Sequence, residues 1–143
     1  MDIVKYLGIP YVWMGRNTSG CDCWGLVQIF YAKEFDITVP DYKDLYSHFG
    51  ETGWTKDKYI ALGFDIFKKA SSNCATAITE KDLKYGDMII LTGVSCTHIG
   101  IYLDSTINSM RMLHSHYPMG SHIVDVRREP YPSRILGYYR WNR

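Results

Sequence analysis

The sequence predicts an α+β fold in which N-terminal helices pack on a central antiparallel β-sheet. The first half of the 143-residue chain contains a strong helical periodicity, whereas the second half consists of short apolar or alternating segments separated by turn residues. Helices followed by a run of strands are typical of α+β proteins. The length suits one compact domain and no repeat or linker divides the chain, so residues 1–143 are expected to form a single domain.

The main helix is predicted directly after the segment SGCDC (residues 19–23). From Trp24 onward, apolar side chains recur at steps of three and four residues as far as Phe35. Asp22 is a good N-cap candidate, because an aspartate side chain can accept a hydrogen bond from the unpaired N–H groups of a first helical turn. Upstream, we expect a short helix at residues 2–7, an extended segment at 11–15 and a polar loop at 16–20.

The rest of the chain is predicted to be mostly strand. Residues 45–62 are expected to be helical in part, and Gly63 separates them from FDIFKKA (residues 64–70), which is predicted to be a strand. Consecutive strands of an antiparallel sheet are then predicted at residues 86–91, 97–104, 109–116, 121–126 and 134–141.

Composition excludes several classes of function. The formal net charge is +1, so nothing global favours nucleic acid or an acidic membrane as a partner. No stretch approaches the roughly 20 apolar residues of a membrane-spanning helix. The N-terminus lacks a basic segment followed by a long apolar core and a cleavage site, so we expect synthesis without a signal peptide.

The pair Cys21 and Cys23 has several possible roles. A structural zinc site with Cys96 and His98 can be imagined, but one intervening residue is a weak zinc spacing, and no metal is expected. A redox pair would prefer two intervening residues. In a chain of this size without an export signal, free thiols are the better expectation, and packing is a sufficient explanation for Cys21.

Cys23 differs from the other cysteines in its position. It follows the predicted N-cap and therefore lies in the first turn, where unpaired N–H groups and the helix dipole stabilise a thiolate. A nucleophilic thiolate needs a base, and the chain offers five histidines: His48, His98, His114, His116 and His122.

His98 opens an apolar strand far downstream of Cys23. A cysteine at a helix start, followed by a histidine on a later strand, is the order found in papain-like enzymes. A third polar group should orient the imidazole. His114 and His116 lie two residues apart on the next predicted strand and share a face, so either is a candidate.

Four segments in order resemble the NlpC-type cysteine peptidases. They are GIPYVWMGRNTSGCDCWGLVQIFY (residues 8–31), LKYGDMIIL (83–91), THIGIYLD (97–104) and RMLHS (111–115). The resemblance spans nearly the whole chain and implies a papain-like fold. It also implies hydrolysis, without a cofactor, of a peptide bond in the peptidoglycan stem, typically between D-γ-glutamate and the diamino acid.

The resemblance also assigns roles to residues. Cys23 matches the nucleophile, His98 the base and His114 the residue that orients the base. Tyr11 matches a tyrosine whose hydroxyl lies near the nucleophile, and Asp22 matches an aspartate that caps the helix and faces the substrate.

The chain departs from the family pattern at three places. The usual Gly-Gly turn is Met14-Gly15, which is a small loss. Trp24 stands where a small residue is common, which should reshape a substrate subsite. The interval between His98 and His114 is longer than usual, so His116 stays a rival third residue.

The finer resemblance is to bacteriophage tail-associated members. These carry Gly-Cys-Asp-Cys before the helix and a Pro-x-Tyr segment after it, as in VPDYKDLY (residues 39–46). It implies a cell wall hydrolase that is made in the cytoplasm and carried in the virion tail, with stem peptides and phage tail-tip proteins as partners. The alternative is a structural or assembly component of the tail tip that keeps the peptidase fold.

Overall fold

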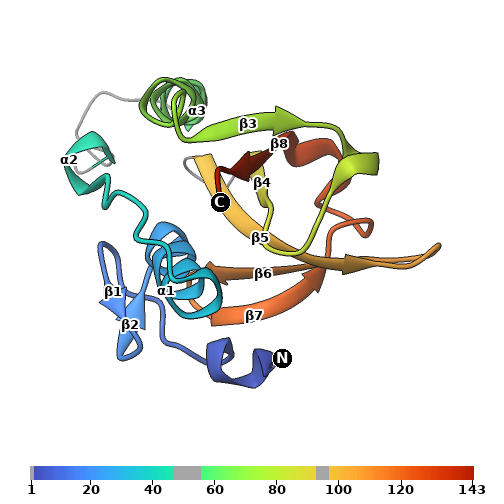
Figure 1. The fold of residues 1–143 in the computed structure, drawn as a ribbon, viewed down its shortest axis with the longest axis horizontal. Helices are drawn as coiled ribbons and strands as arrows, with labels where there is room; N and C mark the ends of the chain where they lie inside the picture. Colours follow the sequence, from blue (N-terminus) through green and yellow to red (C-terminus); the bar gives the residue numbers. More distant parts are fainter. Residues whose placement is uncertain (1, 47–55, 93–96) are drawn as a thin grey trace.

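The computed structural model describes residues 2–46, 56–92 and 97–143. The chain is a mixed α+β protein with an antiparallel sheet, as the sequence predicts, and this sheet has six strands. Helix α1 lies against strands of this sheet, and the small hairpin β1–β2 lies beyond α1 (Figure 1). None of the helices in the described ranges is long and apolar enough to cross a membrane.

The N-terminal segment begins with a 3₁₀ helix at Ile3–Tyr6, inside the predicted range. Its cap is Asp2, whose carboxylate accepts a hydrogen bond from the Val4 amide at 3.1 Å. The predicted loop at residues 16–20 is wrong in detail, because strands β1 (Arg16–Asn17) and β2 (Gly20–Cys21) pair as a tight hairpin. Strands of two residues are too short to show an alternating pattern in the sequence.

Helix α1 spans Cys23–Phe35, which confirms the predicted helix and its cap. Asp22 has an extended backbone and its side chain accepts from the Gly25 amide, as an N-cap residue does. The helix ends at Asp36, which adopts the left-handed conformation with φ of 55°. Seven of its thirteen residues are buried, so α1 is a core helix covered on several sides.

Two further helices follow, α2 (Lys43–Tyr46) and α3 (Lys56–Ala70). Part of the region predicted to be partly helical, residues 47–55, lies outside the described residues. The predicted strand at 64–70 is wrong, because these residues form the end of α3. Phe64 and Phe67, three residues apart on the helix, both contact the ring of Tyr139. Packing at helical spacing therefore outweighs the local strand propensity of this segment.

The sheet has the strand order β3-β8-β4-β5-β6-β7. The five predicted strands are confirmed with small shifts at their ends, and β3 is an additional strand that the sequence pattern did not indicate. Their bounds are β3 Ala75–Ile78, β4 Met88–Thr92, β5 Thr97–Ser105, β6 Met110–His116, β7 Gly120–Asp125 and β8 Ile135–Trp141.

The predicted succession of neighbouring strands holds only for β4 to β7. The last strand, β8, returns to lie between β3 and β4. Asp87, which is fully buried just before β4, supports this return because its carboxylate accepts two hydrogen bonds from Arg140 on β8, at 3.0 and 2.8 Å. A charged group at this depth requires such a partner, and the pair joins two strands far apart in the sequence.

The two faces of the sheet carry different apolar clusters. The larger cluster lies between α1 and the sheet, and it includes Phe30 of the helix and Ile90, Ile101 and Leu113 of the strands. The smaller cluster, on the other face, includes Met112. Burial on both faces explains why the strands read as continuous apolar runs, and it makes the sheet a rigid platform for residues at its strand ends.

Candidate active site

Cys23 is the first residue of α1, and its side chain is half-buried. The helix packs against β5 and β6, the strands on which His98 and His114 lie. Folding thus brings the start of the helix and the two histidine-bearing strands into one region. A thiol at this position is exposed to the positive end of the helix dipole and to the unpaired amides of the first turn.

Asp22 holds the start of the helix in place. Its side chain is 1% exposed, and its two oxygens accept hydrogen bonds from the Gly25 amide at 2.8 Å and the Met14 amide at 3.0 Å. Arg16 adds an ion pair at 2.8 Å and also binds Asp41. These contacts account for the carboxylate as a structural group, and its predicted role toward substrate stays a prediction.

Close packing against the loop before β1 explains why a glycine, Gly25, occurs two residues after Cys23. A Cβ atom at this position would lie 2.2 Å from the carbonyl oxygen of Gly15 and 3.0 Å from the Cβ of Cys21. The loop before β1 can approach the first helical turn only because that side chain is missing. The same approach allows the Met14 amide to reach Asp22.

Three histidines from three adjacent strands form a hydrogen-bonded row. Nε2 of His98 on β5 lies 2.7 Å from Nδ1 of His114 on β6. Nε2 of His114 lies 3.1 Å from Nε2 of His122 on β7, and Nδ1 of His122 lies 2.9 Å from the carbonyl oxygen of Gly120. His114 and His122 are direct partners in the β6–β7 register, which places their side chains on one face.

The rival third residue, His116, occupies a different position. Its ring stacks on His114 with centroids 5.9 Å apart and an interplanar angle of 18°, and it meets the ring of His98 edge-on at 5.9 Å. Within residues 97–143, the hydrogen bond of His98 to another histidine goes to His114. Another candidate base, His48, lies outside the described residues.

Burial determines the charge of His98 and His114. It lowers the pKa of His98, and the neighbouring His116 and His122 lower it further. Burial likewise lowers the pKa of His114, which is 2% exposed, and the other three histidines add to this effect. Both imidazoles are therefore favoured in the neutral form, which has one donor and one acceptor nitrogen.

The depressed pKa of His114 predicts a stability that is lost in mild acid. In the unfolded chain this histidine takes up a proton near its ordinary pKa of about 6.5, whereas the folded protein keeps it neutral. The free energy of unfolding should therefore fall as the pH drops below about 6.5, by up to about 1.4 kcal/mol per pH unit for this one group. Urea unfolding between pH 7 and 5 measures the slope. His114→Asn should remove this contribution, and an equal slope in both proteins would contradict it.

Cys21 lies in a different environment from Cys23. It is fully buried, and burial raises the pKa of its thiol to about 11. Its carbonyl oxygen accepts a hydrogen bond at 3.1 Å from the hydroxyl of Ser115, the neighbour of His114 on β6. This contact attaches the chain just before α1 to the strand that carries His114, across 94 positions of sequence. Cys21 thus fits the packing role that the sequence allowed.

The zinc alternative cannot be completed from the described part of the chain. Within the described residues, Cys21, Cys23 and Cys74 form no disulfide bond, and Cys96 lies outside those residues. Among residues 2–46, 56–92 and 97–143, no group of three or more His, Cys, Asp or Glu side chains is placed to hold a metal ion.

Tyr11 and Trp24 are both close to the helix start in the fold. The backbone of Tyr11 pairs with Cys21, and its ring meets Tyr117 edge-on with centroids 5.9 Å apart. Trp24 is 5% exposed, stacks on Tyr42 and donates its indole N–H to the Pro40 carbonyl at 2.7 Å. The tryptophan is therefore part of the core, and its predicted effect on a subsite would have to act through the loop that it holds.

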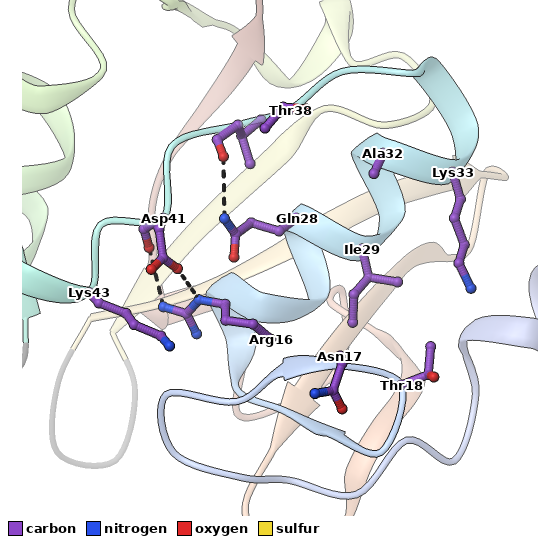
Figure 2. A pocket seen from close by; sticks show the side chains of 11 residues that line it. Arg16, Asn17, Thr18, Gln28, Ile29, Ala32, Lys33, Thr38, Asp41 and Lys43 are labelled. Atoms are coloured by element: carbon purple, nitrogen blue, oxygen red, sulfur yellow. Dashed lines mark hydrogen bonds and ion pairs between the residues drawn. The ribbon is translucent and has the colours of Figure 1, made fainter.

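A pocket of about 670 Å³ lies on the outer side of α1 (Figure 2). It is bounded by the β1 hairpin, by α1 and by the segment that follows the helix. Arg16 reaches Asp41 across one end, and Gln28 donates to the Val39 carbonyl at 3.2 Å. The predicted catalytic residues Cys23, His98 and His114 do not line this pocket.

The fold and the site together define a class of protein. A helix that begins at a cysteine and packs on antiparallel strands carrying a bonded histidine pair is the arrangement of the papain-like fold. The chain belongs to the NlpC/P60 family, whose model matches residues 8–140. This confirms the family predicted from the sequence.

Comparison with solved structures gives the same fold. The chain is similar to the crystal structure of the NlpC/p60 domain of the peptidoglycan hydrolase SagA, with a TM-score of 0.55 and 20% sequence identity. The match covers 95% of this chain and 89% of that chain. No curated protein matches.

Sequence reasoning counted His122 among the possible bases but gave it no place in the site. The missing information was the strand register. Without the position of the β6–β7 turn, the pairing of His122 with His114 could not be predicted. The alternation of His114, His116 and His122 about the turn is the signal that would have indicated a shared face.

Proposed function

We propose that this chain is a cysteine peptidase that hydrolyses a peptide bond in peptidoglycan stem peptides. The observation that carries the proposal is the 2.7 Å hydrogen bond between His98 and His114, on the strands against which the helix beginning at Cys23 packs. Membership of the NlpC/P60 family and the fold shared with a peptidoglycan hydrolase support the substrate class.

In the proposed reaction, the Cys23 sulfur attacks the scissile carbonyl and forms a thioester. His98 first accepts the thiol proton and then donates it to the leaving amine. Water then attacks the thioester with His98 as the base, which releases the acid product and restores the thiol. The Cys23 amide at the helix start stabilises the oxyanion, with the Tyr11 hydroxyl as a second candidate donor.

The environment of His98 favours one version of the first step. Burial and the surrounding histidines lower its pKa, so the imidazole is neutral and able to accept a proton before the reaction starts. Attack is then coupled to transfer of the thiol proton, and the imidazolium is formed where its charge is needed to protonate the amine.

The motif resemblance supports a finer proposal. We infer that the bond cut joins D-γ-glutamate to the diamino acid of the stem. The GCDC segment and the Pro-x-Tyr segment also support a phage tail-associated enzyme carried in the virion, with tail-tip proteins as partners.

Digestion of purified muropeptides tests the proposal and identifies the bond. The wild-type chain should yield fragments whose masses correspond to a cut after γ-glutamate, and Cys23→Ala should yield none. Muropeptides with diaminopimelate and with lysine at the third stem position should be compared in parallel. If the folded wild-type protein releases no fragment from either set, the peptidase proposal is wrong.

The two candidate third residues should differ in their effect on turnover. His114→Ala removes the hydrogen-bond partner of His98 and should lower kcat by on the order of 10²- to 10⁴-fold. His116→Ala removes a stacked ring and should change kcat by less than about tenfold. Steady-state kinetics on a defined stem peptide measures both. A larger loss in His116→Ala than in His114→Ala would reverse the assignment.

A further inference from the structure

The histidine row ends at a group that can only accept a hydrogen bond. The carbonyl oxygen of Gly120 has no proton, so Nδ1 of His122, 2.9 Å away, must carry the proton of that contact. In neutral His122 the other nitrogen, Nε2, is then an acceptor. A carbonyl of the main chain thus sets which nitrogen of His122 is protonated.

This constraint is passed along the row. Nε2 of His114 faces the acceptor Nε2 of His122 at 3.1 Å, so it carries the proton and donates. Neutral His114 then has an unprotonated Nδ1, which accepts from Nε2–H of His98 at 2.7 Å. The remaining nitrogen of His98, Nδ1, is left unprotonated. A base that accepts a thiol proton needs such a nitrogen.

We propose that His122 is a positioning residue that fixes the tautomers of His114 and His98, so that Nδ1 of His98 can accept the Cys23 proton. The proposal rests on the proposed peptidase function for its effect on catalysis, but the tautomer order is a property of the protein without substrate. The row consists of three histidines, each on a different strand, so it depends on the register of β5, β6 and β7.

Other titratable and charged groups surround the row. The groups that act on its members are His116, which stacks on His114 and interacts with His98 and His122, Tyr131, whose ring lies 6.2 Å from His114, and Arg134, which acts on His116. His116 is thus the matched control, because it is a neighbouring histidine that makes ring contacts with two members of the row.

The first test reads the tautomers without substrate. Long-range ¹H–¹⁵N spectra of histidine-labelled protein distinguish protonated from unprotonated ring nitrogens. At neutral pH the wild-type protein should show His98 with an unprotonated Nδ1, and His122→Leu should show a population with the proton on Nδ1. An unchanged His98 tautomer in folded His122→Leu would overturn the proposal.

A conservative variant keeps the test valid if His122→Leu does not fold. In His122→Gln, the carboxamide can donate to Gly120 and accept from His114, as the imidazole does. The His98 tautomer should therefore match that of the wild type. A folded His122→Gln in which Nδ1 of His98 carries the proton would contradict the proposal.

Kinetics supplies the functional readout. His122→Leu should lower kcat on the order of tenfold with little change in KM, and His122→Gln should restore kcat. His116→Leu, the matched control, should change kcat less than His122→Leu does. If no muropeptide is cut but the spectra show the expected tautomers, the peptidase proposal fails and the tautomer assignment stands.

Discussion

Cys23→Ala is expected to abolish hydrolysis while the protein stays folded. The thiol is the proposed nucleophile, and removing the nucleophile of a catalytic triad leaves only the small residual rate that binding and oxyanion stabilisation provide, a loss of at least about 10⁴-fold. The side chain is only half-buried at the first position of α1, so the fold should tolerate its removal. Kinetics on a stem peptide, with circular dichroism and thermal unfolding, measures both effects.

Cys21→Ala is the matched control for this prediction. Cys21 lies two residues away, is fully buried and has a thiol whose pKa is raised to about 11, so it is a poor nucleophile. Its replacement should cost about 1 kcal/mol of stability through lost packing and leave kcat within a few-fold of the wild type. A folded Cys21→Ala without activity, or an active Cys23→Ala, would show that the nucleophile has been misassigned.

Asp22→Ala is expected to give the largest loss of stability. The substitution removes the N-cap of α1, leaves the Met14 and Gly25 amides without their acceptor and strips the buried ion-pair partner from Arg16. Breaking a buried pair from one side typically costs about 3–5 kcal/mol, a large part of the stability of a small domain. Urea unfolding at neutral pH measures the change in the free energy of unfolding.

Two further variants separate the contributions at Asp22. Asp22→Asn keeps an N-cap acceptor but loses the charge, so it should cost less than Asp22→Ala. Asp41→Ala removes the exposed partner of Arg16 and should cost less than about 1 kcal/mol. A change below about 1 kcal/mol in Asp22→Ala itself would mean that the carboxylate does not hold the helix start.

The elements with a complete local signal could be predicted from the sequence. Helix α1 combines an apolar periodicity with a capping aspartate, and both act within one or two turns of the chain. The strands β4 to β7 are bounded by turn residues and read clearly for the same reason. The motif around Cys23 also predicted that this cysteine lies at the start of the helix, because the capping aspartate and the cysteine are adjacent.

The errors occur where distant packing decides the structure. Residues 64–70 read as a strand, but Phe64 and Phe67 pack on Tyr139 of β8 as part of α3. The position of β8 between β3 and β4 likewise depends on contacts across more than 50 residues, such as the pair of Asp87 with Arg140. Local patterns carry no information about such partners.

The candidate site likewise has residues that local sequence predicts and contacts that depend on distant parts of the chain. The sequence order of Cys23 and His98 could be read directly, and alternation narrowed the third residue to His114 or His116. The row that joins His114 to His122 depends on the β6–β7 register, which a one-residue slip would destroy. Asp22 was predicted as a cap, but its pairing with Arg16 required the hairpin β1–β2, whose strands are too short to read.

Partial alkylation tests the central claim most directly, because it asks whether activity resides in the thiol of Cys23. The wild-type chain is treated with limiting iodoacetamide, and each sample is divided between a stem-peptide assay and peptide mapping by mass spectrometry. Residual activity should fall in proportion to the modified fraction of Cys23, while buried Cys21 stays unmodified. Full activity in a sample whose Cys23 is completely alkylated would contradict the account.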